Sequence, residues 1–309
     1  TREIPIIASA MDGVVDVDMA VRLSELGALG VLNLEGVQTR YEDPNAVLDR
    51  IAAVGKTEFV PLMQEIYSQP VQEQLIRKRI QDIKAQGGIA AVSGTPVAAM
   101  RFRKAIAEAG ADLFFVQATV VSTNHIGPEG QATLDLEELC QGMGLPVVIG
   151  NCVTYEVALQ LMRAGAAGVM VGIGPGAACT SRGVLGVGIP QATAVADCAA
   201  ARADFQKESG RYVPIVADGG IVTGGDICKC IACGADAVMI GSPIARAEEA
   251  PGRGFHWGMA TPSPVLPRGT RINVGSTGSI ERILRGPAKL DDGTHNLLGC
   301  LKTSMGTLG

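Results

Sequence analysis

The 309-residue sequence has few aromatic residues, no excess of basic residues and no long apolar run. Phe, Trp and Tyr make up 4% of it, which argues against a surface that stacks the bases of single-stranded nucleic acid. The net charge of −5 offers no basic face to a nucleic acid or an anionic membrane. No run reaches the ~18–20 apolar residues that span a bilayer. The opening Thr-Arg-Glu-Ile-Pro leads directly into a strand-like run, so no signal peptide is expected.

The eight cysteines follow neither the spacing of a disulfide framework nor that of a metal site. They are scattered among apolar segments, so we expect reduced thiols and a cytoplasmic protein. Cys228, Cys230 and Cys233 lie close together, but they do not share one face of a helix and no histidine is near them. We interpret them as small buried residues. Among the three histidines, only His256, in a long loop, is a candidate site residue.

Short apolar runs alternate with longer segments of helical pattern along the chain. The candidate strands are residues 4–10, 28–33, 59–64, 89–94, 112–118, 146–151, 168–173, 214–218 and 237–241. The helical segments include residues 74–86, 97–109, 154–164, 190–204 and 225–233. Fully apolar strands suit a parallel sheet that is covered on both faces. The alternation therefore predicts the α/β class and a single (β/α)₈ TIM barrel over residues 1–309.

Nine candidate strands are one more than this barrel needs. Residues 59–64 give the weakest pattern, because their continuation reads as a connection, and we assign them to an accessory segment. The phrase Ala-Gly-Ala-Asp, or a close variant, precedes strands at 109–112, 164–168 and 233–236. It indicates a helix C-cap that leads into the next strand, repeated around the barrel.

The alternating pattern ends near residue 250. Residues 251–279 contain four prolines, many glycines and no helical period, so we expect a long active-site loop there. Helical character returns near 279–285 and 294–305.

Residues 171–183, Val-Gly-Ile-Gly-Pro-Gly-Ala-Ala-Cys-Thr-Ser-Arg-Gly, directly follow a strand. Their alternating glycines expose backbone N–H and C=O groups that suit a phosphate or a monovalent cation. Cys179 would lie at the C-terminal end of a barrel strand, where barrel active sites are found. Nearby N–H groups or Arg182 would favour its thiolate. On pattern alone, an inert cysteine in a glycine-rich turn is the alternative; a Rossmann motif fits poorly, because no helix begins at once.

Two late strands end in glycines, in Pro-Ile-Val-Ala-Asp-Gly-Gly-Ile (214–221) and Val-Met-Ile-Gly-Ser (238–242). Such strand ends form the usual phosphate cradle of a barrel. Asp218 suits two ribose hydroxyls, although a capping Asp beside turn glycines is the alternative. Further candidates at strand ends, each weak alone, are Ser9, Met11 and Asn151.

In order, the motifs Gly-Asn-x-x-Thr, Val-Gly-Ile-Gly-Pro-Gly-x-x-Cys-Thr, Ala-Asp-Gly-Gly-Ile, Gly-Asp-Ile and Val-Met-Ile-Gly-Ser resemble the IMP dehydrogenase/GMP reductase family. The match runs from about residue 4 to 309 and contains no tandem CBS regulatory insert. The chain is therefore similar to the CBS-less, IMP dehydrogenase-related branch. The resemblance implies a purine nucleotide substrate, NAD as cofactor, a potassium ion, and a homotetramer or octamer.

The resemblance also implies roles for the matching residues. Cys179 would attack C2 of the hypoxanthine ring while a hydride leaves for NAD⁺, and Ser181 would orient the hydrolytic water. The substrate would be held by Ser9, Met11, Asn151, Gly176, Asp218, Gly220, Gly241, Ser242, His256, Gly258 and Met259. The carbonyl groups of Gly174, Gly176 and Cys179 would form the potassium site.

Some positions depart from the family pattern. Ala177 stands where the family has a phosphate-binding Ser, and Ser181 replaces a Thr. Gln117-Ala118-Thr119 replaces the Asp-Ser-Ser element that holds the cofactor ribose, so Gln117 and Thr119 are the cofactor-binding candidates.

The flap whose Arg-Tyr pair activates the hydrolytic water has no match in the sequence. The only basic residues in the corresponding segment 260–275 are Arg268 and Arg271, which become candidates for that catalytic role. Arg268 also stands where a Glu or Gln normally contacts the purine N1.

Three functions are compatible with these motifs. IMP dehydrogenase is favoured by Gly-Gly-Ile and Gly-Ser at the two cradles, where reductases more often have Gly-Gly-Cys and Gly-Gly. GMP reductase, which uses NADPH, is favoured by the absent CBS insert and the missing Arg-Tyr flap. A catalytically silent nucleotide-binding regulator is the third, but binding alone needs no thiol at residue 179.

Overall fold

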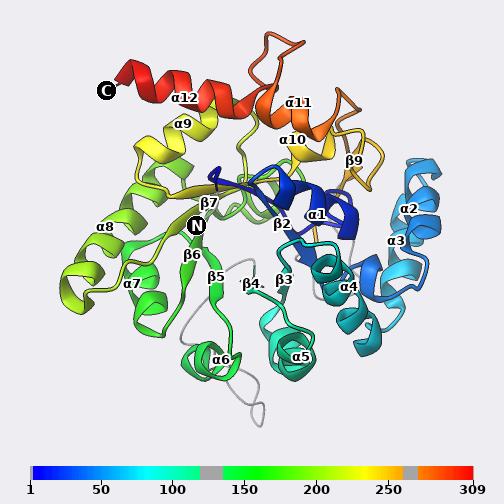
Figure 1. The fold of residues 1–309 in the computed structure, drawn as a ribbon, viewed down its shortest axis with the longest axis horizontal. Coiled ribbons are helices and arrows are strands. Elements are labelled where there is room, and N and C mark those ends of the chain that lie inside the picture. Colours follow the sequence, from blue (N-terminus) through cyan, green and yellow to red (C-terminus); the bar gives the residue numbers. More distant parts are fainter. Residues whose placement is uncertain (1–2, 119–134, 260–270, 309) are drawn as a thin grey trace.

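The computed structural model describes residues 3–118, 135–259 and 271–308. Within them, eight parallel strands pair in sequence order and β8 pairs with β1, which closes a barrel. The strands are β1 (Ile6–Ala8), β2 (Leu29–Asn33), β3 (Ala91–Gly94), β4 (Leu113–Gln117), β5 (Val147–Cys152), β6 (Gly168–Val171), β7 (Ile215–Asp218) and β8 (Ala237–Ile240). Helices surround them (Figure 1), so the predicted (β/α)₈ TIM barrel is confirmed.

The connections between strands carry the helices. These are α1 (Val17–Glu25), α2 (Pro44–Ala53), α3 (Phe59–Ser68), α4 (Glu73–Ala85), α5 (Pro96–Glu108), α6 (Leu136–Gly142), α7 (Tyr155–Arg163), α8 (Gln191–Ser209) and α9 (Gly224–Ala232). After β8 come α10 (Ser242–Ala245), α11 (Ile280–Arg285) and α12 (Leu297–Leu308). Many begin at a side-chain cap; Thr223 and Asp226 form a capping box at α9. None of the helices in the described ranges has the length and apolarity needed to cross a membrane.

The apolar side chains alternate between two layers of core. Every strand contributes to a cluster inside the barrel: Ile7, Leu29, Val31, Ala91, Phe115, Val148, Met170, Val216 and Met239. The alternate residues of the same strands face outward and pack against the helices. Because both faces are covered, the strands are apolar throughout, which is why they are easy to find in the sequence.

The repeated Ala-Gly-Ala-Asp phrase does end helices, as the sequence predicts. Gly110, Gly165 and Gly234 follow α5, α7 and α9 with φ values of +84°, +99° and +106°. A residue without a Cβ takes up this left-handed conformation without strain, and the chain can then turn directly into the next strand.

Residues 59–64 are not a strand. They form the first part of α3, which makes a hairpin with α2 between β2 and β3 at the edge of the molecule (Figure 1). Its buried residues Phe59, Met63, Ile66 and Tyr67 recur at helical spacing, but the apolar run Phe-Val-Pro-Leu-Met obscures this period. The assignment to an accessory segment outside the barrel is nevertheless right.

The long connection after β8 is described except for residues 260–270. Before and after that gap, β9 (Phe255–His256) and β10 (Ile272–Asn273) pair antiparallel. Helices α11 and α12 follow close to the predicted positions.

Candidate active site

A cavity of about 550 Å³ opens at the carboxyl ends of the barrel strands. Residues from the ends of all the barrel strands line it, together with His256, Gly258 and Met259 of the long connection. The lining includes these predicted site residues: Ser9, Met11, Gln117, Asn151, Gly174, Gly176, Cys179, Ser181, Asp218, Gly220, Gly241, Ser242, His256, Gly258 and Met259. Positions spread over most of the sequence therefore meet in one place. Thr119 and Arg268 lie outside the described residues.

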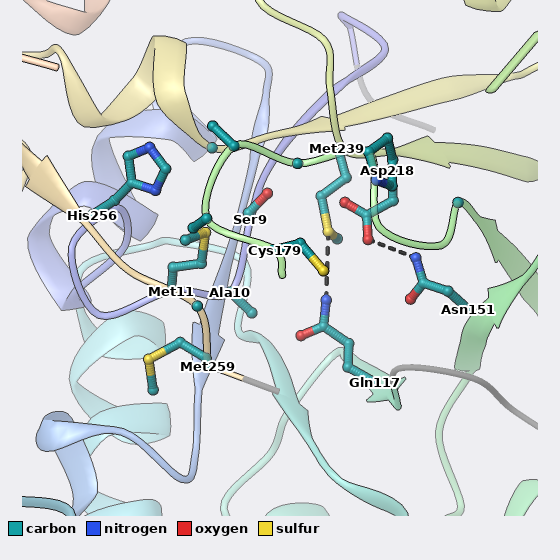
Figure 2. A pocket seen from close by; sticks show the side chains of 18 of the residues that line it. Ser9, Ala10, Met11, Gln117, Asn151, Cys179, Asp218, Met239, His256 and Met259 are labelled. Carbon is teal, nitrogen blue, oxygen red and sulfur yellow. Dashed lines mark hydrogen bonds between the residues drawn. The ribbon is translucent and has the colours of Figure 1, made fainter. Parts of the chain in front are cut away.

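Cys179 lies on the loop after β6 and is exposed to the cavity. Figure 2 shows its sulfur pointing into the middle of the surrounding side chains, with Gln117, Ser9 and Asp218 on different sides. Its thiol donates a hydrogen bond to the Ser181 hydroxyl oxygen at 3.3 Å. Its backbone N–H donates to the Gly176 carbonyl at 3.0 Å, which closes the loop into a turn. The thiol is thus accessible and has a hydroxyl beside it, as a nucleophile requires.

The Arg182 side chain packs against the backbone of the Cys179 loop. Its guanidinium donates to the carbonyls of Ile173, at 3.1 Å, and Ile189. Its side-chain carbons lie so close to Gly174 and Gly188 that a Cβ at either position would come within 2.7 Å of them. These hydrogen bonds stabilise the conformation of the cysteine loop. On the sequence alone, Arg182 is instead a candidate for a positive charge that favours the Cys179 thiolate.

Asp218 ends β7 opposite the cysteine. Its carboxylate accepts a hydrogen bond from the Asn151 amide at 2.8 Å (Figure 2). Burial raises the pKa of Asp218 to about 6, and the Asn151 hydrogen bond opposes that rise. At neutral pH the group is mainly ionised, so it can accept hydrogen bonds from a pair of hydroxyl groups.

The glycines after β7 and β8 bring the backbone to the cavity wall. Gly219 and Gly220 have φ values of +91° and +73°, and a Cβ at Gly220 would lie 2.9 Å from the Pro175 carbonyl oxygen. The loop after β7 therefore packs directly on the cysteine loop. After β8, a Cβ at Gly241 would lie 3.2 Å from the Met11 sulfur, so the backbone there also packs closely on the cavity wall.

His256 and Ser242 form a neutral pair next to these glycines. The Ser242 hydroxyl lies 2.9 Å from His256 Nε2, and burial lowers the pKa of His256 to about 4. The imidazole is therefore uncharged at neutral pH. None of the described residues that line the cavity is Lys or Arg. An anionic group would thus be held there by backbone N–H groups, hydroxyls and imidazole rather than by a cation.

Sequence reasoning missed one part of the cavity wall. It comes from the ends of β2 and β3: Asn33, Glu35, Ser93, Gly94 and Thr95. The Glu35 carboxylate accepts from the Thr95 backbone N–H at 2.6 Å and from its hydroxyl at 3.2 Å. A signal was present, because polar residues end these two predicted strands as they do the others.

Arg271 is not part of the cavity lining. Its guanidinium donates to the carbonyls of Ile51 and Val54, at the end of α2, and lies between the rings of Phe59 and Phe255. Burial lowers its pKa. This geometry makes Arg271 an anchor for β10, and it gives no support to the predicted role in activating water.

Comparisons with known proteins identify the family. The model of the IMP dehydrogenase/GMP reductase domain matches residues 1–260. The chain is 40% identical to a Mycobacterium leprae protein described as an uncharacterized oxidoreductase, over 99% of this chain and 84% of that one. It is 34% identical to the inosine-5'-monophosphate dehydrogenase of Cryptosporidium parvum, over 81% of this chain and 61% of that one.

A solved structure agrees with these sequence matches. It is the crystal structure of an IMP dehydrogenase/GMP reductase-like protein from Corynebacterium glutamicum. It superimposes with a TM-score of 0.92 at 35% identity, over all of this chain and 82% of that one. In the described ranges, no CBS insert interrupts the barrel. The chain thus belongs to the IMP dehydrogenase/GMP reductase family of oxidoreductases.

Proposed function

We propose that this protein is an IMP dehydrogenase, which oxidises IMP to XMP with NAD⁺ through a covalent intermediate on Cys179. The observation that carries the proposal is the meeting of three features in one cavity. These are an accessible thiol, a carboxylate suited to a ribose diol, and two glycine-ended strands suited to a phosphate. Family membership supports a purine nucleotide as the ligand of such a site.

In the first chemical step, the Cys179 sulfur would form a bond to C2 of the hypoxanthine ring, and the C2 hydrogen would leave as a hydride to NAD⁺. In the second, water would attack C2 of the resulting thioimidate, the C–S bond would break, and XMP and the free thiol would be released. Water is the source of the new C2 oxygen, and one proton is released overall. Splitting the oxidation in this way avoids a single step of high barrier.

The surrounding residues would orient these steps. Asp218 would accept the ribose hydroxyls, while the N–H groups after β7 and β8, with Ser242 and His256, would hold the phosphate. Ser181 lies 3.3 Å from the reacting sulfur, which places its hydroxyl where it could orient the hydrolytic water. We propose Ser181 for this role. Arg268 and Arg271 remain predictions, Arg271 without structural support.

The cavity wall at the ends of β2 and β3 suits NAD better than NADP. It contains the carboxylate of Glu35, and the described cavity lining offers no Lys or Arg to the additional 2'-phosphate of NADP. GMP reductase uses NADPH, so this charge pattern favours the dehydrogenase over the reductase. We assign Gln117, which lines the cavity at the end of β4 next to β3, to the cofactor side of the cavity.

Potassium suits the donors of the cysteine loop. Residues 172–180 contain no charged side chain, and their carbonyls are the hard oxygen ligands that alkali cations prefer. Gly174, Gly176 and Cys179 would hold the ion, which would stabilise the loop in its active shape. We also expect a homotetramer or octamer and a cytoplasmic location.

One assay separates the three functions. Purified protein is given IMP with NAD⁺, then GMP with NADPH, and the absorbance band of the reduced nicotinamide is followed. NADH formed from IMP supports the dehydrogenase, whereas NADPH consumed with GMP would replace it with the reductase. Nucleotide binding without turnover in either direction would leave a silent regulator.

A further inference from the structure

A buried polar group links the α2–α3 hairpin to the wall of the cavity. The Tyr67 hydroxyl, on α3, donates to the Asp12 carboxylate at 2.5 Å and accepts from the Trp257 indole N–H at 2.8 Å. Each of these side chains is only 1% exposed. Hydrogen bonds among groups buried this deeply are expensive to break, because a donor left without a partner keeps its full desolvation penalty. The hydroxyl of Tyr67 therefore joins the hairpin firmly to two other segments.

Both of these segments lead directly into the cavity. Asp12 follows Met11 in the sequence, and Trp257 precedes Gly258 and Met259. Met11, Gly258 and Met259 line the cavity. The same tyrosine hydroxyl lies 3.4 Å from the Met259 sulfur. One atom on α3 thus contacts the supports of two neighbouring pieces of the wall, Met11 and Met259, although α3 itself does not line the cavity.

Close backbone packing keeps these supports in register. The Val37 N–H donates to the same Asp12 oxygen at 2.9 Å, and any side chain at Gly36 would collide with the Asp12 carboxylate. On the other side, the Gly252 N–H donates to the Gly13 carbonyl at 3.2 Å. The turn after β1 is therefore fixed between the hairpin and the segment that leads to β9.

The hairpin also holds the strand that pairs with β9. Arg271, next to β10, bonds to carbonyls at the end of α2 and stacks on Phe59 of α3. Phe255, Trp257 and Met259 belong to the same apolar cluster as the hairpin. Thus α2 and α3 contact both β9 and β10, the two strands in the described part of the long connection.

We propose that Tyr67 is a positioning residue for the active site. Through Asp12 and Trp257 it fixes Met11 and Met259 relative to each other, and so sets the shape of this wall of the cavity for the purine base. The proposal rests on the proposed function only for the identity of the nucleotide.

The test uses Tyr67→Phe, with Tyr41→Phe as the matched control. The Tyr41 hydroxyl donates to the Ile66 carbonyl at 3.0 Å and packs against the same cluster, but Tyr41 does not line the cavity. Trp257 is the only tryptophan of the chain. Its fluorescence, and the quenching of that fluorescence by acrylamide, therefore report on the surroundings of the Tyr67–Trp257 hydrogen bond. IMP binding is measured by calorimetry on the same proteins. Asp12→Asn, which keeps the side-chain shape, serves as a second variant if Tyr67→Phe folds poorly.

We expect Tyr67→Phe to make Trp257 more accessible to acrylamide and to weaken IMP binding about tenfold, since a buried donor loses its acceptor. Tyr41→Phe should change the acrylamide quenching of Trp257 and the affinity for IMP by less than about twofold each. Wild-type values in Tyr67→Phe, or equal losses in both variants, would overturn the positioning role. A wild-type protein that binds no purine nucleotide would instead refute the proposed function, while the quenching of Trp257 would still decide the role of Tyr67.

Discussion

Replacing Asp218 with Asn should weaken substrate binding and at the same time stabilise the protein. Burial raises the pKa of Asp218 from 3.8 to about 6, so the folded state holds this proton more tightly than the unfolded chain does. That difference corresponds to about 3 kcal/mol. The ionised carboxylate therefore destabilises the fold at neutral pH, and a neutral Asn of the same shape removes this penalty.

The sign of the effect fixes its pH dependence. Below pH 3.8 Asp218 is protonated in both the folded and the unfolded state, so its ionisation does not change the free energy of unfolding. Between pH 3.8 and about 6 the unfolded chain releases its proton first, so the stability of the wild type falls, and above pH 6 the loss is constant. Asp218→Asn should thus exceed the wild type in free energy of unfolding by about 3 kcal/mol at pH 8 and by about half as much at pH 5.

Urea unfolding at the two pH values measures this difference, and calorimetry with IMP measures the binding loss. Each ribose hydroxyl that loses a charged acceptor should cost ~1.5–3 kcal/mol, which is roughly a tenfold to hundredfold weaker affinity. Asp226→Asn is the control of opposite sign. Although burial raises the pKa of Asp226, its hydrogen bonds with Lys229 and with Thr223 and Val222 hold it at about 2.

This control variant should lose about 1–2 kcal/mol of stability at pH 7, because the charged acceptor in the capping box of α9, which also pairs with Lys229, becomes a neutral amide. The reasoning about Asp218 would be refuted if its Asn variant were less stable than the wild type at pH 8, or if it bound IMP equally well.

Two other substitutions test the structural parts of the site. Gly220→Ala forces a side chain into a backbone with φ of +73° and against the Pro175 carbonyl, so we expect about 1–3 kcal/mol of destabilisation and weaker nucleotide binding; unchanged urea unfolding would contradict the strain. Arg271→Met removes two hydrogen bonds and two ring contacts, so the protein should lose about 2–3 kcal/mol in urea unfolding. Hydrolysis lost without any loss of stability would return Arg271 to the catalytic candidates.

Much of the barrel could be predicted from the sequence because its physical cause is local. Strands covered on both faces are apolar throughout, and each helix before a strand ends at a glycine such as Gly110. Parallel strands bring their carboxyl ends together, so polar or glycine residues after strands, such as Cys179 and Asp218, could be expected to meet.

The parts that the sequence did not reveal depend on contacts between distant segments. The helical spacing of α3 lies within a run that is apolar at almost every position, so its period is hidden. Whether Arg271 faces a cavity or two aromatic rings is decided by the fold around it. The same holds for Tyr67, whose hydroxyl meets Asp12 and Trp257 only in three dimensions.

The central claim is that Cys179 carries the purine during turnover. Its most direct test is mass spectrometry of the peptide containing Cys179 after rapid acid quenching of enzyme with IMP and NAD⁺. We predict an adduct of IMP less one hydride on Cys179, absent when NAD⁺ is omitted, and a Cys179→Ala variant that binds IMP without turnover. Steady turnover with no adduct, and with Cys179→Ala near wild-type activity, would contradict the covalent mechanism.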